Sequence, residues 1–239
     1  MSRYARWRKD GYMSSDDRRK CFDIGRTTSR AISSFERAVD GREAVPELGL
    51  GYHGCRGEYD SGNGGIMRLA PIPIYYFGEG KETARSMAKK SSMTTHASVE
   101  CLESADLMSD VIWDLLHGAR REDILKTPRD DFTSQKVRDI SCKTFVHKTR
   151  NEIGTSGYVV HTLEAALWAF LRTVTFEDGM YELASMGKDV DTVCCVYGQI
   201  AGAYYGFNAI PSRWVNALQK KEMVSKVVSD LVHDSLPAD

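Results

Sequence analysis

Apolar residues recur every three or four positions along most of this 239-residue chain, and this spacing constrains its fold more than any other feature. Such spacing places apolar side chains on one face of a helix, whereas strands need alternation, which is nearly absent here. In the segment 95–118 the recurring positions are Val99, Leu102, Ala105, Met108, Ile112 and Leu115. We therefore expect an all-α protein of about eight or nine helices.

The residues that end or begin helices predict where several of these helices lie. Gly118 suits the end of the helix in 95–118, and Ser156 suits the N-cap of a helix over 156–174. Pro211 suits the first turn of a short helix around Trp214, and a last helix is expected over about 221–234. The apolar face of the helix over 156–174 is predicted to bury Val160, Leu163, Leu167, Phe170 and Val174. The apolar face of the last helix is predicted to bury Val224, Val227, Val228 and Leu231.

Composition excludes several classes of protein. The formal net charge of -1 gives no electrostatic footprint for nucleic acid or an anionic membrane. Apolar stretches fall far short of the ~20 residues that span a bilayer, and the basic N-terminus is not a secretory signal. The six cysteines include no C-x-x-C pair, and their even number would permit disulfides. Because a chain this long can build a core without disulfides, we expect buried, reduced thiols in a cytoplasmic protein. We expect a single domain over residues 1–239 and a monomer.

The segment Gly41–Gly65 differs from the rest because it holds eight of the 20 glycines. A loop this long within a compact domain is usually functional or disordered. It ends in SGNGG, residues 61–65, which is expected to run directly into a helix beginning IMRLAPIP. Glycines let backbone N–H groups approach a phosphate, and Ser61 and Asn63 offer hydrogen bonds to a ribose or phosphate. The alternative is a flexible turn.

Two further motifs carry polar side chains at predicted helix starts. In TTH, residues 94–96, His96 can donate to a ligand phosphate, or Thr94 or Thr95 simply caps the helix. In DVDT, residues 189–192, the carboxylates of Asp189 and Asp191 suit a hard ion such as Mg²⁺ or Mn²⁺, or these residues serve as a helix N-cap. Gly198, Gly202 and Gly206 follow on one helix face. They predict close packing at the centre of the bundle and an inward-facing acidic pair.

Five blocks together resemble the ADP-ribosylglycohydrolase family, in order and in spacing. They are CFDIGRTT (21–28), SGNGGIMRLAPIP (61–73), TTHASVECLESA (94–105), SGYVVHTLEAALWAF (156–170) and GKDVDTVCCVYGQIAGAYYG (187–206). The bacterial branch that resembles dinitrogenase reductase-activating glycohydrolases is the most similar. The resemblance implies a compact, orthogonal multi-helix bundle that hydrolyses the bond between ADP-ribose and a protein side chain, using two Mg²⁺ or Mn²⁺ ions.

The resemblance also implies a role for particular residues. The expected metal ligands are Asp189, Asp191 and Thr192. The expected contacts to ADP-ribose are Ser61, Gly62, Asn63 and Gly64 at the diphosphate and distal ribose, His96 at the phosphates, and Gly157, Tyr158 and Val159 in the nucleotide pocket. The expected catalytic residues are Asp23, beside the scissile ribose, and Asp191. A pair of ions about 3.5–4 Å apart can hold the ribose hydroxyls and an attacking water together.

The sequence departs from the family pattern in two places. Relatives carry a Thr-Asp-Asp-Thr motif, the other half of the two-metal site, some tens of residues before the stretch with which this chain begins. The segment Ser14–Asp17 is a poor substitute, because relatives have a surface loop there. We therefore expect an N-terminally truncated domain with exposed apolar surface and poor hydrolysis of ADP-ribosyl-arginine. His161 stands where relatives often carry aspartate, and we expect little effect from it.

Three functions fit these observations. They are a metal-dependent hydrolase acting on ADP-ribosylated protein, a non-catalytic ADP-ribose-binding protein, and a structural protein like the eye-lens crystallins that share the fold. The intact DVDT and SGNGG motifs count against the third. Arginine is the expected acceptor by resemblance to the bacterial branch alone. Serine, cysteine or a nucleic-acid end, and the choice between Mg²⁺ and Mn²⁺, stay open.

Overall fold

The computed structural model describes residues 1–14, 19–57 and 59–235. Within them the chain forms eleven α-helices, more than the eight or nine predicted, and no strand. The helices are α1 (Ser2–Asp10), α2 (Arg26–Val39), α3 (Pro71–Tyr75), α4 (Lys81–Met93), α5 (Val99–Leu116), α6 (Gln135–Ser141), α7 (Val159–Arg172), α8 (Phe176–Ala184), α9 (Val190–Tyr205), α10 (Ser212–Ala217) and α11 (Lys221–Ser235). The predicted all-α class is confirmed.

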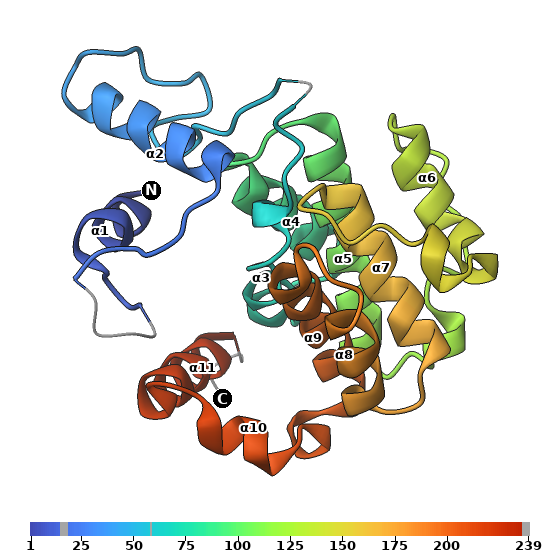
Figure 1. Cartoon of the computed structure of the whole chain (residues 1–239). Coiled ribbons are helices and arrows are strands. Elements are labelled where there is room, and N and C mark those ends of the chain that lie inside the picture. Colours follow the sequence, from blue (N-terminus) through green and yellow to red (C-terminus); the bar gives the residue numbers. More distant parts are fainter. Residues whose placement is uncertain (15–18, 58, 236–239) are drawn as a thin grey trace.

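Helices α5, α7 and α9 pack against one another at the centre, with α4 beside α5 and α8 beside α7 and α9 (Figure 1). Helix α7 is apolar on nearly every side, as a central helix must be. Its residues from Val159 to Phe170 are buried except His161. Helices α1 and α2 lie to one side of this core, and α10 and α11 lie below it in the same view.

Several predicted helix ends are confirmed and others are wrong. Gly118 follows the last residues of α5 with φ +82°, the left-handed conformation that stops a helix without strain in glycine. Helix α7 begins at Val159 with Tyr158 at the N-cap, so Ser156 is not its cap. Pro211 occupies the N-cap of α10 rather than its first turn.

Some side chains predicted to be buried are exposed. Val99 at the start of α5 and Val174 beyond the end of α7 are exposed, because they lie where their helices leave the core. Helix α11 forms where predicted but contains no buried residue. Its exposed side chains include Val224, Val227 and Val228. None of the helices in the described part of the chain has the length and apolar character that crossing a membrane requires.

The glycines of α9 do not serve the purpose that the sequence suggested. A Cβ at Gly198 would make only ordinary contact with Met180, one at Gly202 would meet nothing within 4 Å, and Gly206 ends the helix with φ +75°. The buried face of α9 is instead formed by larger side chains: Val193, Val196, Tyr197, Ile200 and Ala201. The prediction of a closely packed glycine stripe was therefore wrong.

The long segment after α2 is irregular, as predicted, until the 3₁₀-helix Asn63–Gly65. No α-helix follows immediately, because a turn at Ile66–Arg68 precedes α3. The segment returns to the core through an isolated bridge between Cys55 and His96. All six cysteines are free thiols, and Cys142 and Cys195 are exposed rather than buried.

Candidate functional site

Two loops that are far apart in the sequence pair beside the start of α7. The backbone N–H of Asn63 donates to the Gly157 carbonyl at 3.0 Å, and the backbone N–H of Val159 donates to the Ser61 carbonyl at 2.9 Å. These bonds form an antiparallel bridge between Gly62 and Tyr158. The SGNGG turn and the SGYV segment, both predicted to contact ADP-ribose, therefore lie side by side. Because the backbone N–H of Asn63 is already bonded to the Gly157 carbonyl, it is not available to a phosphate in this arrangement.

The side chain of Asn63 connects this pair of loops to the DVDT motif. Its Nδ2 donates to Thr162 Oγ1 at 2.9 Å and to Asp189 Oδ2 at 2.6 Å. Gly157 also adjoins Asp189, since a Cβ at Gly157 would lie 3.4 Å from Asp189 Oδ2. Asp189 of the predicted inward-facing acidic pair therefore lies against the Ser61–Gly65 turn. The prediction was wrong for Asp191, which is exposed.

Asp189 occupies the N-cap position of α9 by its backbone, but its side chain does not cap the helix. The carboxylate turns instead toward Asn63, and its other oxygen, Oδ1, lies 3.4 Å from Thr192 Oγ1. Thr192 is buried, Asp189 is half-buried and Asp191 is exposed. The alternative interpretation of DVDT as a simple helix cap therefore fails for the Asp189 side chain.

These oxygens fit a hard cation in kind but form a small ligand set. Asp189 Oδ1, Thr192 Oγ1 and the Asp191 carboxylate are all oxygen donors from the first turn of one helix or its N-cap, as Mg²⁺ or Mn²⁺ prefers. In the described part of the chain, no group of three histidine, cysteine or acidic side chains is arranged to hold a metal ion. An ion bound here would take its remaining ligands from water or from a substrate. Residues 15–17 of the rejected Ser14–Asp17 segment lie outside the described residues.

His96 lies beneath the glycine turn. A Cβ at Gly62 would lie 3.2 Å from His96 Nε2, and one at Gly64 would lie 2.6 Å from His96 Cε1. These glycines are needed because the imidazole ring occupies the space that a side chain would fill. Burial and the positive charge of Arg68 lower the pKa of His96 to about 4, so the ring is neutral at neutral pH.

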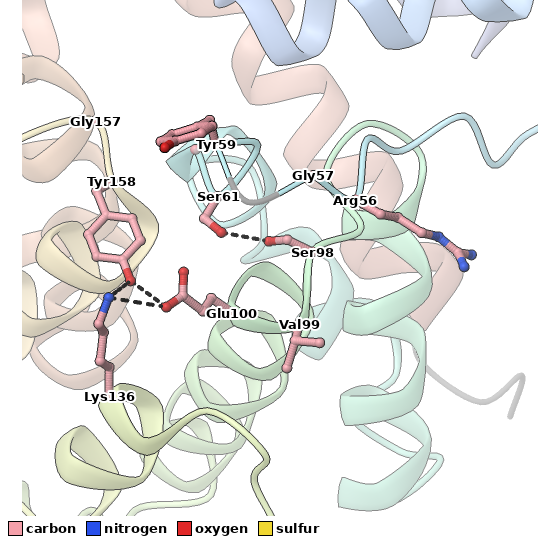
Figure 2. A pocket seen from close by; sticks show the side chains of 11 residues that line it. Arg56, Gly57, Tyr59, Ser61, Ser98, Val99, Glu100, Lys136, Gly157 and Tyr158 are labelled. Atoms are coloured by element: carbon pink, nitrogen blue, oxygen red, sulfur yellow. Dashed lines mark hydrogen bonds and ion pairs between the residues drawn. The ribbon is translucent and has the colours of Figure 1, made fainter.

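The cap of α5 is Ser98, whose hydroxyl accepts from the Cys101 amide. The alternative in which Thr94 or Thr95 caps this helix therefore fails, and His96 precedes the helix rather than lying in its first turn. The hydroxyl of Ser98 also bonds the hydroxyl of Ser61 at 2.9 Å (Figure 2). This bond ties the glycine turn to the start of α5.

A cavity of about 780 Å³ opens beside the paired loops. Figure 2 shows its polar side chains, and dashed lines join Tyr158, Glu100 and Lys136. The Tyr158 hydroxyl donates to Glu100 Oε1 and accepts from Lys136 Nζ at 2.9 Å. The cavity is lined by Arg56, Gly57, Tyr59, Ser61, Gly62, Ser98, Val99, Glu100, Lys136, Gly157 and Tyr158.

The structure places the predicted residues in three groups. Ser61, Gly62, Gly157 and Tyr158 line the cavity. A second group does not line the cavity: Asn63, Gly64, His96, Val159, Asp189, Asp191 and Thr192. Within this group, Asn63 bonds the Gly157 carbonyl, His96 lies against Gly62 and Gly64, and Asp189 lies against Gly157. Asp23 is exposed in the connection between α1 and α2, and no hydrogen bond or ion pair among the described residues joins it to the other two groups.

Sequence reasoning missed Glu100, Lys136 and Arg56. Glu100 could have been found from the sequence, because it lies in the first turn of α5, beside the predicted ligand-binding motif at residues 94–96. Lys136 had none, since α6 is brought to the cavity only by tertiary packing. Arg56 also lacked a signal, because it lies in the middle of an irregular segment.

A sequence model of the ADP-ribosylglycohydrolase family matches residues 1–238. The chain is 34% identical over 230 residues to the ADP-ribosylarginine hydrolase Tri1 of Serratia proteamaculans, covering 95% of this chain and 58% of that protein. It is 24% identical over 202 residues to the ADP-ribosyl-[dinitrogen reductase] glycohydrolase of Rhodospirillum rubrum, covering 83% of this chain and 61% of that protein.

A solved structure described as an ADP-ribosylglycohydrolase-related protein complex superimposes with a TM-score of 0.74 and 35% sequence identity. The alignment covers 89% of this chain and 70% of that one. By contrast, this chain spans 58% and 61% of the lengths of the Serratia and Rhodospirillum relatives.

Proposed function

This chain belongs to the ADP-ribosylglycohydrolase family, and on that premise we propose that it binds ADP-ribose and removes it from modified arginine side chains of proteins. Two matched relatives are named ADP-ribosylarginine hydrolases, which favours arginine as the acceptor. The observation that carries the proposal is the bond of 2.6 Å from Asn63 Nδ2 to Asp189 Oδ2. It holds the acidic motif against the turn that borders the cavity.

ADP-ribose is proposed to lie along the cavity with its diphosphate at Ser61–Gly64 and its adenosine toward Tyr158. The Ser61 hydroxyl and the His96 ring would donate to the diphosphate, and the Tyr158 ring offers an aromatic surface to the base. The distal ribose would then extend past Gly157 toward Asp189. The cavity volume of about 780 Å³ falls in the range that ligand sites usually have.

Asp189, Asp191 and Thr192 are proposed to hold Mg²⁺ or Mn²⁺ together with water and substrate oxygens. Such an ion would lower the pKa of a bound water and would hold it beside the ribose hydroxyls. The protein's own contribution is orientation, because Asn63 fixes one Asp189 oxygen and leaves the other toward Thr192. Asp191, exposed at the same helix end, is proposed to accept a proton from the attacking water. Asp23 is proposed to approach the scissile ribose only when substrate is bound.

The second candidate is an ADP-ribose-binding protein without turnover. It is favoured by the small number of metal-ligating side chains among the described residues, which implies weak metal binding. Both candidates predict ADP-ribose binding, and they differ in the effect of metal.

Calorimetry of the full chain with ADP-ribose, with and without Mg²⁺ or Mn²⁺, tests the proposal. Release of ADP-ribose from an ADP-ribosylated arginine peptide is followed in parallel. Metal-enhanced binding with turnover supports the hydrolase, and metal-independent binding without turnover supports the binding protein. Absence of ADP-ribose binding at millimolar concentration would overturn both.

A further inference from the structure

A chain of hydrogen bonds leads to the ring of His96 from Arg68 and Thr95, two residues that the proposed function does not use. Arg68 Nη2 donates to Thr95 Oγ1 at 2.7 Å, and Thr95 Oγ1 lies 2.8 Å from His96 Nδ1. Thr95 is completely buried, so its hydroxyl has no access to solvent. The direction of each bond in this chain is therefore set by the protein alone.

The bond directions follow from what each group can donate. A guanidinium has only N–H donors, so the Thr95 oxygen must be the acceptor from Arg68. The Thr95 hydroxyl has one hydrogen, and His96 Nδ1 is its only hydrogen-bond partner besides Arg68 among the described residues. A buried hydroxyl left without an acceptor is costly. The Thr95 hydroxyl therefore donates to Nδ1, which must carry no proton.

We propose that Arg68 and Thr95 fix His96 as the neutral tautomer protonated on Nε2, and that this N–H donates to the anionic group of a ligand bound at the glycine turn. Nε2 is the atom nearest Gly62, at 3.2 Å from the position of a Cβ there. No acceptor among the described residues bonds it, and it is not one of the side-chain atoms sealed from solvent without a partner. Arg68 and Thr95 are thus positioning residues for His96.

Arg68 is itself held rigidly, which makes it an effective anchor. It donates to the Gly64 carbonyl within the same turn and to Thr94 Oγ1 at 3.1 Å. The Arg68 side chain therefore stabilises the Ser61–Gly65 turn through the Gly64 carbonyl and sets the tautomer of the His96 ring through Thr95. Its positive charge also disfavours a protonated His96, which agrees with a neutral ring.

The tautomer is a property of the protein without ligand, whereas the donor role rests on the proposed function. ¹⁵N NMR of the full chain labelled at histidine measures the first directly, and the spectrum of His96→Gln identifies the His96 signals among those of the six histidines. We expect a protonated Nε2 and an unprotonated, hydrogen-bonded Nδ1 at pH 7. A proton on Nδ1, or an even mixture of tautomers, would overturn the proposal.

Two substitutions separate this role from simple packing. Thr95→Val removes the hydroxyl but keeps the shape. We expect its His96 Nδ1 signal to move to that of an unbonded nitrogen and its affinity for ADP-ribose to fall about tenfold. Thr95→Ser keeps the hydroxyl and should retain both the signal and the affinity. Equal Nδ1 signals, or equal affinities, in the Val and Ser variants would contradict the proposal.

The tautomer of His96 and its donor role can be refuted separately. A wild-type chain that binds no ADP-ribose overturns the proposed function and the donor role, and the ligand-free spectrum still decides the tautomer. If Thr95→Val does not fold, Arg68→Met is measured instead. Without Arg68, the Thr95 oxygen can accept from Nδ1, so we expect part of the population to carry its proton there. An unchanged single tautomer in Arg68→Met would count against the role of Arg68.

Discussion

Asn63 and Asp189 are 126 positions apart in the sequence and are joined by a hydrogen bond of 2.6 Å from Nδ2 to Oδ2. The other Nδ2 hydrogen goes to Thr162 Oγ1, which in turn donates to the Ser156 carbonyl. Both donors of the amide are therefore used within the protein. We therefore expect Asn63 to influence a ligand chiefly by orienting the Asp189 carboxylate.

Asn63→Ala is expected to weaken the metal-dependent part of ADP-ribose binding about tenfold, because Asp189 loses a charge-assisted bond and its fixed orientation. The metal-independent affinity should change much less. Calorimetry with and without Mg²⁺ measures both quantities. Asn216→Ala, at an exposed position of α10, is the matched control and should behave like the wild type. An equal loss of affinity in both conditions would refute the orienting role.

Gly179→Ala in α8 should destabilise the protein by about 1–3 kcal/mol, although alanine favours helices more than glycine does. The new Cβ would overlap the hydroxyl and ring of Tyr197, whose hydroxyl bonds the carbonyls of Thr175 and Phe176. Gly202→Ala in α9 meets no neighbour and should stabilise by about 0.5–1 kcal/mol. Urea unfolding of the two variants measures both, and changes of the same sign would contradict this account.

The helices with strong apolar periodicity could be predicted from the sequence, and the purpose of individual small or polar residues could not. Helices α5, α7 and α11 lie close to their predicted ranges. The glycines of α9 were misjudged because sequence spacing does not reveal which helix face is covered. Gly179 belongs to no sequence pattern, yet it is the glycine in α8 that Tyr197 contacts too closely to leave room for a Cβ.

The candidate site was predictable where neighbouring residues in the sequence form it. SGNGG and DVDT were found because each concentrates its polar groups within a few residues. Lys136 and Arg68 were not assigned roles, because their partners are supplied by distant segments. Long-range hydrogen bonds of this kind follow from the packing of helices, which a single sequence does not specify.

Asp106→Asn should lower the free energy of unfolding by about 3 kcal/mol, because it leaves three half-buried cations without the buried anion that they share. The carboxylate receives Arg85 Nε at 2.6 Å, Lys89 Nζ at 3.0 Å and Arg129 Nη1 at 3.2 Å. Asp131→Asn removes an exposed partner of Arg129 and should cost less than about 1 kcal/mol. Similar losses in the two variants, measured by urea unfolding, would count against a special role for Asp106.

The same carboxyl should contribute to acid unfolding. Burial alone would raise its pKa, but the bonds from Arg85 and Lys89 outweigh burial and lower the pKa of Asp106 below its ordinary value. Its stabilisation is therefore complete above about pH 4 and is lost as pH falls through the lowered pKa. The stability difference between wild type and Asp106→Asn should shrink below about pH 4, and a constant difference would contradict this.

Tyr158→Phe tests whether the polar group at the cavity edge contributes to ligand binding. The substitution keeps the ring and releases Glu100 and Lys136, which both bond the Tyr158 hydroxyl. We expect a loss of ADP-ribose affinity of less than about fivefold for Phe and of more than about tenfold for Tyr158→Ala, which also removes the aromatic surface. Calorimetry distinguishes the two, and equal losses would assign the whole effect to the hydroxyl.

His96 should make the stability of the protein depend on pH between about 4 and 6.5. Burial and Arg68 lower its pKa from 6.5 in the unfolded chain to about 4 in the folded protein. The unfolded state therefore binds more protons in this interval, and the stabilisation present above pH 6.5 is lost as pH falls toward the folded pKa.

His96→Gln removes this titration, while His53, whose pKa burial also lowers, stays in both proteins. The free energy of unfolding should thus fall by up to about 3 kcal/mol more in the wild type than in His96→Gln over this interval. Parallel pH profiles of the two proteins would show that His96 is not held neutral by the fold.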